Sequence, residues 1–254
     1  MNGHPNQSRE PLVSVVIPIY NRINLAIRAI ESVLAQSYSN TEIIVINDGS
    51  DSDDSDLLNR FSPKSKFKYI TLPVNVGPAA ARNEGITHSS GRYIAFLDSD
   101  DVWHAEKLRI QIDRMIRHNW VWSHTSYFRH DTRTGRRKTV RSGSISYSFP
   151  RVAFSCRIAT PTVVVDRNFL GSRMFRSNLR YGEDVLLWIQ LARLTTLHGI
   201  DEPLATVFVG EDTAALDSLI QRDVLRLQGT DGLSGNRLLQ VVHSIYRMLR
   251  NLIR

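Results

Sequence analysis

Cysteine is nearly absent from this chain, and so are long apolar segments. Cys156 is the only cysteine among the 254 residues, so an internal disulfide and a zinc site built from cysteines are both excluded. No apolar run approaches the ~18 residues of a membrane-spanning helix, and the polar start MNGHPNQSRE lacks the apolar stretch of a signal peptide. We therefore expect a cytoplasmic protein that is soluble or attached peripherally to the inner face of the membrane.

Internal repeats and nucleic-acid-binding motifs are also missing, although the charge is strongly positive. The sequence has 32 Lys and Arg against 25 Asp and Glu, a formal net charge of +7, which favours polyanionic partners such as nucleotides or an anionic membrane. Basic residues gather in RHDTRTGRRKTVR at 129–141, but they lie apart from any aromatic platform pattern. Because a charge run usually faces solvent, we expect a solvated loop there and no nucleic-acid partner.

What the sequence does contain is an alternation of strand-like and helix-like segments. Short apolar runs rich in β-branched residues alternate with helical patterns. In chain order the expected elements are a strand at 12–19, a helix at 24–36, strands at 42–46 and 67–72, a helix at 78–89, a strand at 93–97 and a helix at 105–118. This pattern predicts an α/β fold, with a mostly parallel central sheet that is covered by helices on both faces.

The regular alternation of strand-like and helix-like segments ends after residue 120. The chain length and an apolar content of 42% nevertheless fit one large domain. Here we expect a strand at TSYF, a hairpin around Gly135, a helix at 183–194, a last short strand at 204–209 and helices beyond it. The predicted organisation is a polar tail at 1–11, one domain at 12–228 with halves 12–118 and 119–228, and a helical C-terminal extension at 229–254.

Four motifs fall at the carboxyl ends of predicted strands, where an open α/β sheet binds its ligands. In IPIYN, the residues Pro18, Ile19 and Tyr20 end the first strand and leave backbone groups free to face a ligand. A simple strand terminator explains Pro18 equally well. In INDGS, Asp48 directly follows an apolar strand, where its carboxylate can accept the imide N–H of uracil or thymine. Such residues also form ordinary turns and helix caps.

The third and fourth motifs are suited to phosphate and metal binding. In NVGPAAARNEG, Gly77 leads into a helix whose N-terminus and Arg82 both favour phosphate. In YIAFLDSDDVW, the carboxylates of Asp98, Asp100 and Asp101 would repel one another at the mouth of the sheet. A Mn²⁺ or Mg²⁺ ion shared with a diphosphate would relieve this repulsion. The alternative is an acidic turn that caps the following helix, with Asp101 as the best candidate for the cap.

In this order and spacing, IPIYN, NDGS, NVGPAAARNEG and FLDSDDVW together resemble the nucleotide-binding half of glycosyltransferase family 2, whose fold is called GT-A. The resemblance covers residues 13–107. It implies an inverting transferase in cell-surface polysaccharide or lipopolysaccharide synthesis, with a nucleotide-sugar donor and a glycan or lipid-linked acceptor. It also implies a Mn²⁺ or Mg²⁺ ion bound chiefly by Asp100, with Asp98 assisting through water or the ribose. Because Asp48 can accept a pyrimidine imide, we expect a UDP- or dTDP-sugar.

The resemblance further implies an acidic motif on the acceptor side, and YGEDVLLW supplies it. Asp184 would be the general base, and Glu183 would position that base or the acceptor. An acidic first turn that complements the helix dipole is the structural alternative. The chain departs from the family where Asn47 replaces the first of two carboxylates, and where FVGEDTAALDS lacks a His near the metal, leaving Glu211 or Asp212 as substitutes.

Two alternatives stay open on the sequence alone. Residues 236–254 have apolar positions at helical spacing with arginines among the polar positions, which is typical of a helix that lies on an anionic membrane or packs against protein. The chain as a whole could also be a nucleotide- or glycan-binding protein that kept the fold and lost catalysis. The missing His favours that reading, whereas the intact set Asp98, Asp100 and Asp184 argues for an enzyme.

Overall fold

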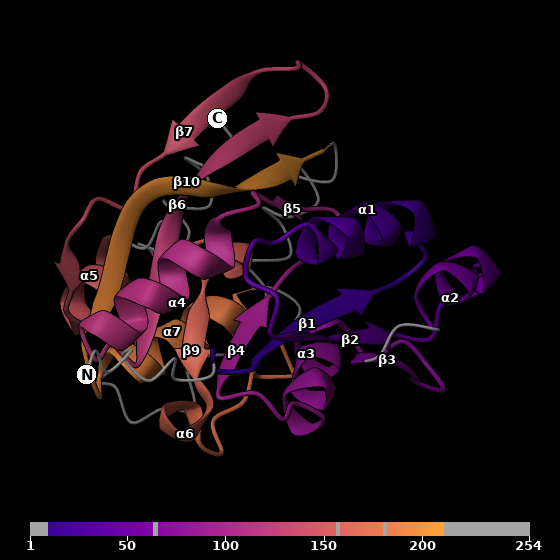
Figure 1. Ribbon diagram of the computed structural model, residues 1–254, viewed down its shortest axis with the longest axis horizontal. Helices are drawn as coiled ribbons and strands as arrows, with labels where there is room; N and C mark the ends of the chain where they lie inside the picture. Colours follow the sequence, from indigo (N-terminus) through magenta and orange to yellow (C-terminus); the bar gives the residue numbers. More distant parts are fainter. Residues whose placement is uncertain (1–9, 63–65, 156–157, 180–181, 211–254) are drawn as a thin grey trace, which may run out of the picture.

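The computed structural model describes residues 10–62, 66–155, 158–179 and 182–210, and these residues form one α/β unit (Figure 1). Its strands are β1 Val13–Ile19, β2 Thr41–Asn47, β3 Phe67–Thr71, β4 Tyr93–Phe96, β5 Val102–Trp103, β6 Trp122–Asp131, β7 Arg137–Val140, β8 Ser146–Tyr147, β9 Val164–Asp166 and β10 Leu197–Val209. Its helices are α1 Ile23–Leu34, α2 Ser55–Phe61, α3 Pro78–Thr87, α4 Lys107–Arg117, α5 Phe149–Ser155, the 3-10 helix η1 Thr160–Thr162, α6 Arg167–Leu170 and α7 Glu183–Ala192.

Within these residues the strands form a single sheet in the order β3-β2-β1-β4-β9-β6-β10-β5, with β7 added to β6 and β8 to β10. The first four strands are parallel, β9 runs antiparallel to both β4 and β6, and β6 is parallel to β10. The carboxyl ends of β1, β2 and β4 therefore meet at one edge, and three of the four motifs follow these ends. The prediction of a mostly parallel sheet is confirmed.

Helices cover both faces of the sheet, as predicted, because β1 is buried on both sides. Val15 and Ile17 of β1 belong to the core that packs against α1 and α4. Val16 points the other way, into the core formed with α3 and α7. Figure 1 shows α1 and α3 on opposite sides of the strands β1 and β2. This double burial explains why the strand reads as a continuous apolar run.

Helix α3 approaches the sheet closely because its inward residues are small. Ala79 and Ala81 are buried, and a Cβ atom added to Gly85 would lie 2.3 Å from Cγ1 of Val16. No larger residue fits there unless the Val16 side chain is displaced. The small residues of NVGPAAARNEG thus bring the N-terminus of α3 down beside the carboxyl ends of the neighbouring strands.

The structure corrects two expectations. Asp101 does not cap a helix, because the chain continues into β5 and α4 begins only at Lys107; the Asp101 carboxylate instead accepts the amide N–H of Phe208 at 2.9 Å. The last strand is also far longer than predicted, since β10 begins at Leu197. Pro203 concealed this start, and the structure accommodates that proline where the register of β10 against β6 shifts.

Some expectations concern other parts of the chain. The polar tail apart from its last two residues, Glu211, Asp212 and the helix at 236–254 lie outside the described residues. The division into a domain at 12–228 and an extension at 229–254 stays a prediction. Among the helices that the structure describes, none is long and apolar enough to cross a membrane.

Candidate active site

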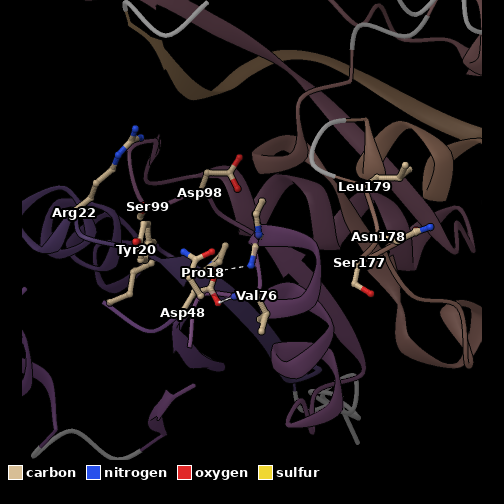
Figure 2. Close-up of a pocket in the computed structure, with 14 residues that line it drawn as sticks. Pro18, Tyr20, Arg22, Asp48, Val76, Asp98, Ser99, Ser177, Asn178 and Leu179 are labelled. Atoms are coloured by element: carbon tan, nitrogen blue, oxygen red, sulfur yellow. Dashed lines mark hydrogen bonds between the residues drawn. The ribbon is translucent and has the colours of Figure 1, made fainter. Parts of the chain in front are cut away.

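A cavity of about 730 Å³ opens at the carboxyl edge of the sheet (Figure 2). This volume is typical of a small-molecule site. Most of the predicted donor-binding residues line it, together with several that were not predicted: Pro18, Ile19, Tyr20, Arg22, Asp48, Asn75, Val76, Gly77, Pro78, Asp98, Ser99, Ser177, Asn178 and Leu179. The structure therefore brings the ends of β1, β2 and β4 and the start of α3 together around one cavity.

Asp48 organises the loop that forms one wall of this cavity. Its Oδ1 accepts the amide N–H of Val76 at 2.8 Å, and its Oδ2 accepts the amide N–H of Gly77 at 2.9 Å (Figure 2). Gly77 has a φ of 90°, a conformation that favours glycine. Each carboxylate oxygen can accept a further hydrogen bond, so contact with a pyrimidine imide stays a prediction for Asp48.

Asn47, at the position where the family often has a carboxylate, stabilises the same corner. Its Oδ1 accepts the amide N–H of Ser50 at 2.9 Å, and its Nδ2 lies 2.9 Å from the Tyr69 hydroxyl. The Asn47 side chain therefore bonds to other residues of the fold, whereas its neighbour Asp48 lines the cavity.

The segment after β4 concentrates negative charge at the cavity mouth. Arg22 donates to Oδ2 of Asp100 at 2.7 Å, and Arg28 donates to its backbone oxygen at 2.8 Å. Burial, and then the charge of Asp98, still raise the pKa of Asp100. Burial, followed by the charges of Asp98 and Asp100, raises the pKa of Asp101 well above its usual range. The arginines therefore offset the repulsion among these carboxylates only in part.

Asp98 and Asp100 fit a hard divalent cation. Their side chains are 28% and 32% exposed, so their oxygens reach the solvent. Mg²⁺ and Mn²⁺ prefer oxygen ligands and usually complete their shell with waters and substrate phosphates. Within the described part of the chain, no three Asp, Glu, His or Cys side chains are arranged to hold a metal by themselves. A diphosphate in the cavity would supply the ligands that the protein does not.

Arg82 joins this acidic segment to the start of α7. Its Nη2 donates to Oδ1 of Asp98 and its Nη1 donates to Oε1 of Glu183, both at 2.7 Å. The side chains of Arg82 and Glu183 are only 7% and 9% exposed. Arg82 thus binds two carboxylates behind the cavity wall, and its predicted contact with phosphate stays a prediction.

The acidic pair begins helix α7, which starts after Gly182. Glu183 is buried, and this burial together with the charge of Asp184 raises its pKa to about 7, while Arg82 opposes the rise. Asp184 is half-buried; its Oδ1 accepts the amide N–H of Val185 at 2.7 Å and its Oδ2 accepts the Thr160 hydroxyl at 2.8 Å. The two acids therefore have different environments, with Glu183 in a buried ion pair and Asp184 nearer the surface.

The far wall of the cavity could not be read from the sequence. Ser177, Asn178 and Leu179 lie across the cavity from Tyr20 and Arg22 (Figure 2). None of the three is charged or belongs to a recognisable motif, and they enter the site only because the chain returns to the carboxyl edge of β4 before α7. Arg22 also lines the cavity, and only its position directly after IPIYN in the sequence could have indicated this.

An α/β sheet with a small-molecule cavity at the carboxyl ends of its parallel strands is typical of enzymes that bind nucleotides. The family model for Glycosyl transferase family 2 matches residues 14–177. The chain belongs to this family, and the resemblance seen in its four motifs is confirmed.

Curated relatives agree with this family. The UDP-Glc:alpha-D-GlcNAc-diphosphoundecaprenol beta-1,3-glucosyltransferase WfgD of Escherichia coli is 34% identical over 190 residues, which are 75% of this chain and 73% of the relative. The putative teichuronic acid biosynthesis glycosyltransferase TuaG of Bacillus subtilis is 32% identical, over 77% of this chain and 78% of the relative. An uncharacterized glycosyltransferase of Rickettsia bellii is 44% identical over 82% of this chain but only 30% of its own length. The chain thus spans about a third of the length of that relative.

Solved structures confirm the GT-A fold. A crystal structure of S. aureus TarS, residues 1–349, superimposes with a TM-score of 0.67 at 18% identity, over 91% of this chain and 69% of that one. A crystal structure of the same protein in complex with UDP-GlcNAc has a TM-score of 0.68 at 17% identity, over 91% and 70% of the two chains. Identity this low establishes the shared fold alone.

Proposed function

We propose that this protein is an inverting, metal-dependent glycosyltransferase. It transfers a sugar from a UDP- or dTDP-sugar to a hydroxyl of a glycan or lipid-linked acceptor in cell-surface polysaccharide synthesis. One observation carries the proposal: Arg82 donates both to Asp98, which lines the cavity, and to Glu183 of the acidic pair, which is far from Asp98 in the sequence. In an inverting, metal-dependent transfer, acidic groups on the donor side hold the cation and one on the acceptor side acts as the general base.

Asp184 is the general base in this proposal. Its carboxylate takes the proton of the acceptor hydroxyl as that oxygen attacks the anomeric carbon, opposite to the leaving nucleoside diphosphate. One displacement breaks the bond to the diphosphate and inverts the anomeric centre. Positioned bases of this kind contribute about 10²–10⁴-fold in rate. Glu183 is held by Arg82 and orients the first turn of α7.

Asp98 and Asp100 would hold the Mn²⁺ or Mg²⁺ ion. When bound, the ion neutralises the charge that develops on the leaving diphosphate. The side chains that this chain supplies around that charge are the two aspartates and Arg22, which donates to Asp100.

The donor and acceptor classes rest on the site and on the relatives. The Asp48 carboxylate borders the cavity and can accept the imide N–H of uracil or thymine, which cytosine lacks. The names of WfgD and of the TarS complex mention UDP-Glc and UDP-GlcNAc, and that of WfgD also mentions a diphosphoundecaprenol acceptor. A lipid-linked acceptor is consistent with action at the inner face of the cytoplasmic membrane, with residues 236–254 as a peripheral contact.

A ligand screen tests the donor class and metal dependence. Thermal unfolding is followed with UDP, dTDP, GDP and CMP sugars, each with and without Mn²⁺. A ligand at about 100 times its Kd stabilises the folded protein by about 2.7 kcal/mol. We expect stabilisation by a UDP- or dTDP-sugar that depends on the metal. Stronger stabilisation by a GDP-sugar would refute the assigned donor class.

The division of labour between the acids tests the mechanism. Asp100→Ala should abolish metal-dependent donor binding as well as turnover. Asp184→Asn keeps the shape of the side chain, so the donor should bind normally while transfer falls by about 10²-fold or more. Donor titrations and initial rates measure the two effects separately. Near-normal transfer by Asp184→Asn would move the base elsewhere, with Glu183 as the next candidate.

A further inference from the structure

The carboxylate of Asp184 is held by a short turn that no sequence motif indicated. This turn is η1, Thr160–Thr162, and the Thr160 hydroxyl donates to Oδ2 of Asp184 at 2.8 Å. The other carboxylate oxygen accepts the amide N–H of Val185. Among the described residues, Oδ1 of Asp184 therefore has a donor in its own helix, and Oδ2 has a donor in a different part of the fold.

Buried polar side chains hold the turn that carries Thr160 in place. The indole Nε1 of Trp103 donates to the Pro161 backbone oxygen at 2.7 Å. The amide Nε2 of Gln111 donates to the Thr162 backbone oxygen at 3.0 Å. Lys107, which is fully buried, donates to Oε1 of Gln111 at 2.9 Å. Consecutive carbonyls of the turn are thus fixed by side chains of β5 and α4.

One of these anchors, Trp103, adjoins the donor side of the site. Trp103 closes β5, the short strand that follows the aspartates Asp98 and Asp100. The hydrogen bond from Trp103 to Pro161 therefore links the strand that follows the acidic segment to the turn whose Thr160 contacts Asp184. The ion pairs of Arg82 form a separate connection that ends on Glu183, so each acid of the pair is tied to the donor side by its own contact.

We infer that Thr160 is a positioning residue for the general base. It does not touch the reacting atoms. Its hydroxyl fixes one oxygen of Asp184 in a single orientation, so that the carboxylate faces the acceptor hydroxyl without first searching among rotamers. This inference rests on the proposed role of Asp184. Loss of a hydrogen bond to a charged group, or a displacement of about 1 Å at a reacting group, lowers the rate by about 10- to 100-fold.

The test compares two threonines of the same turn. Thr160→Val removes the hydroxyl with little change in shape, and Thr160→Ser retains it. Thr162→Val is the matched control, because Thr162 is equally buried and its hydroxyl donates within the turn, to the Ala159 oxygen at 2.6 Å. We expect Thr160→Val to lower kcat about 10-fold or more at unchanged donor KM, whereas Thr160→Ser and Thr162→Val stay within about threefold of the normal enzyme.

Two results would overturn the inference: a kcat for Thr160→Val within about threefold of normal, or an equal loss in Thr162→Val. Thermal midpoints are measured for each variant, and if Thr160→Val does not fold, Thr160→Ala takes its place in the same comparison.

A double variant separates this inference from the proposed function. If Thr160 acts through Asp184, adding Thr160→Val to Asp184→Asn should lower the rate no further, because the two residues act as a unit. A further loss equal to that of Thr160→Val alone would show that Thr160 acts independently. If Asp184→Asn alone transfers at a near-normal rate, the assignment of the base has failed. A strongly impaired Asp184→Asn beside a normal Thr160→Val would refute only the role of Thr160.

Discussion

Replacing Arg82 by Met tests whether the bridge between Asp98 and Glu183 stabilises the fold. Arg82 donates to both carboxylates at 2.7 Å. Met fills a similar volume with an apolar chain but removes the charge and both hydrogen bonds. Glu183 would then be buried beside Asp184 without a cationic partner. We expect a large loss of stability, because an unpaired buried charge costs more than the pair contributed.

The magnitude follows from the exposure of the two partners. Glu183 is only 9% exposed, so its pair with Arg82 belongs to the buried class, in which removal of one partner costs about 3–5 kcal/mol. Asp98 is 28% exposed, so water can hydrate its carboxylate when Arg82 is removed. This second pair therefore adds at most about 1 kcal/mol to the loss. A loss of about 3–5 kcal/mol corresponds to a fall in Tm of roughly 10 °C for a protein of this size.

Urea unfolding at pH 9 measures this loss, because near neutral pH Glu183, whose pKa is about 7 even beside Arg82, would take up a proton in the variant and avoid the unpaired charge. The control is Arg60→Met, since Arg60 pairs with Asp56 at 2.9 Å on the surface of α2, where the side chains are 51% and 56% exposed; this variant should lose no more than about 0.5 kcal/mol. Adding Glu183→Gln to Arg82→Met removes the stranded charge and should restore part of the stability. The reasoning fails if Arg82→Met costs less than about 1 kcal/mol, or if Glu183→Gln gives no relief.

Three further predictions concern other parts of the chain. Burial lowers the pKa of His124 from 6.5 to about 3, so between these values only the unfolded state binds the proton and stability falls as the pH drops. Between pH 7 and pH 5, the free energy of unfolding should therefore fall by about 2 kcal/mol less in His124→Phe than in the normal protein. An equal fall in both proteins would contradict the lowered pKa of His124. Gly85→Ala should cost about 1–3 kcal/mol despite the better helix propensity of Ala, because its Cβ would meet Val16; urea unfolding checks this, and adding Val16→Ala should recover part of the loss. Deletion of 236–254 should abolish co-sedimentation with anionic liposomes, and unchanged binding would exclude the membrane role.

Local sequence patterns predicted most of the first half of the fold correctly. The strands β1, β2, β3 and β4 and the helices α1 and α3 were predicted within a few residues, because their patterns are local and strongly periodic. The motifs that follow β1, β2 and β4 were expected to share one edge, since the carboxyl ends of parallel strands meet there. In the structure, Pro18, Asp48 and Asp98 accordingly line one cavity.

The way in which the second half completes the site could not be predicted from local patterns, because it depends on strand pairing. Strand β9 enters the sheet antiparallel between β4 and β6, and this pairing returns η1 and α7 to the edge where the donor motifs lie. The contacts of Arg82 with Glu183, of Thr160 with Asp184 and of Asp101 with Phe208 follow from it. None has a local signature, because a long-range hydrogen bond depends on the register and direction of strands that lie far apart in the chain.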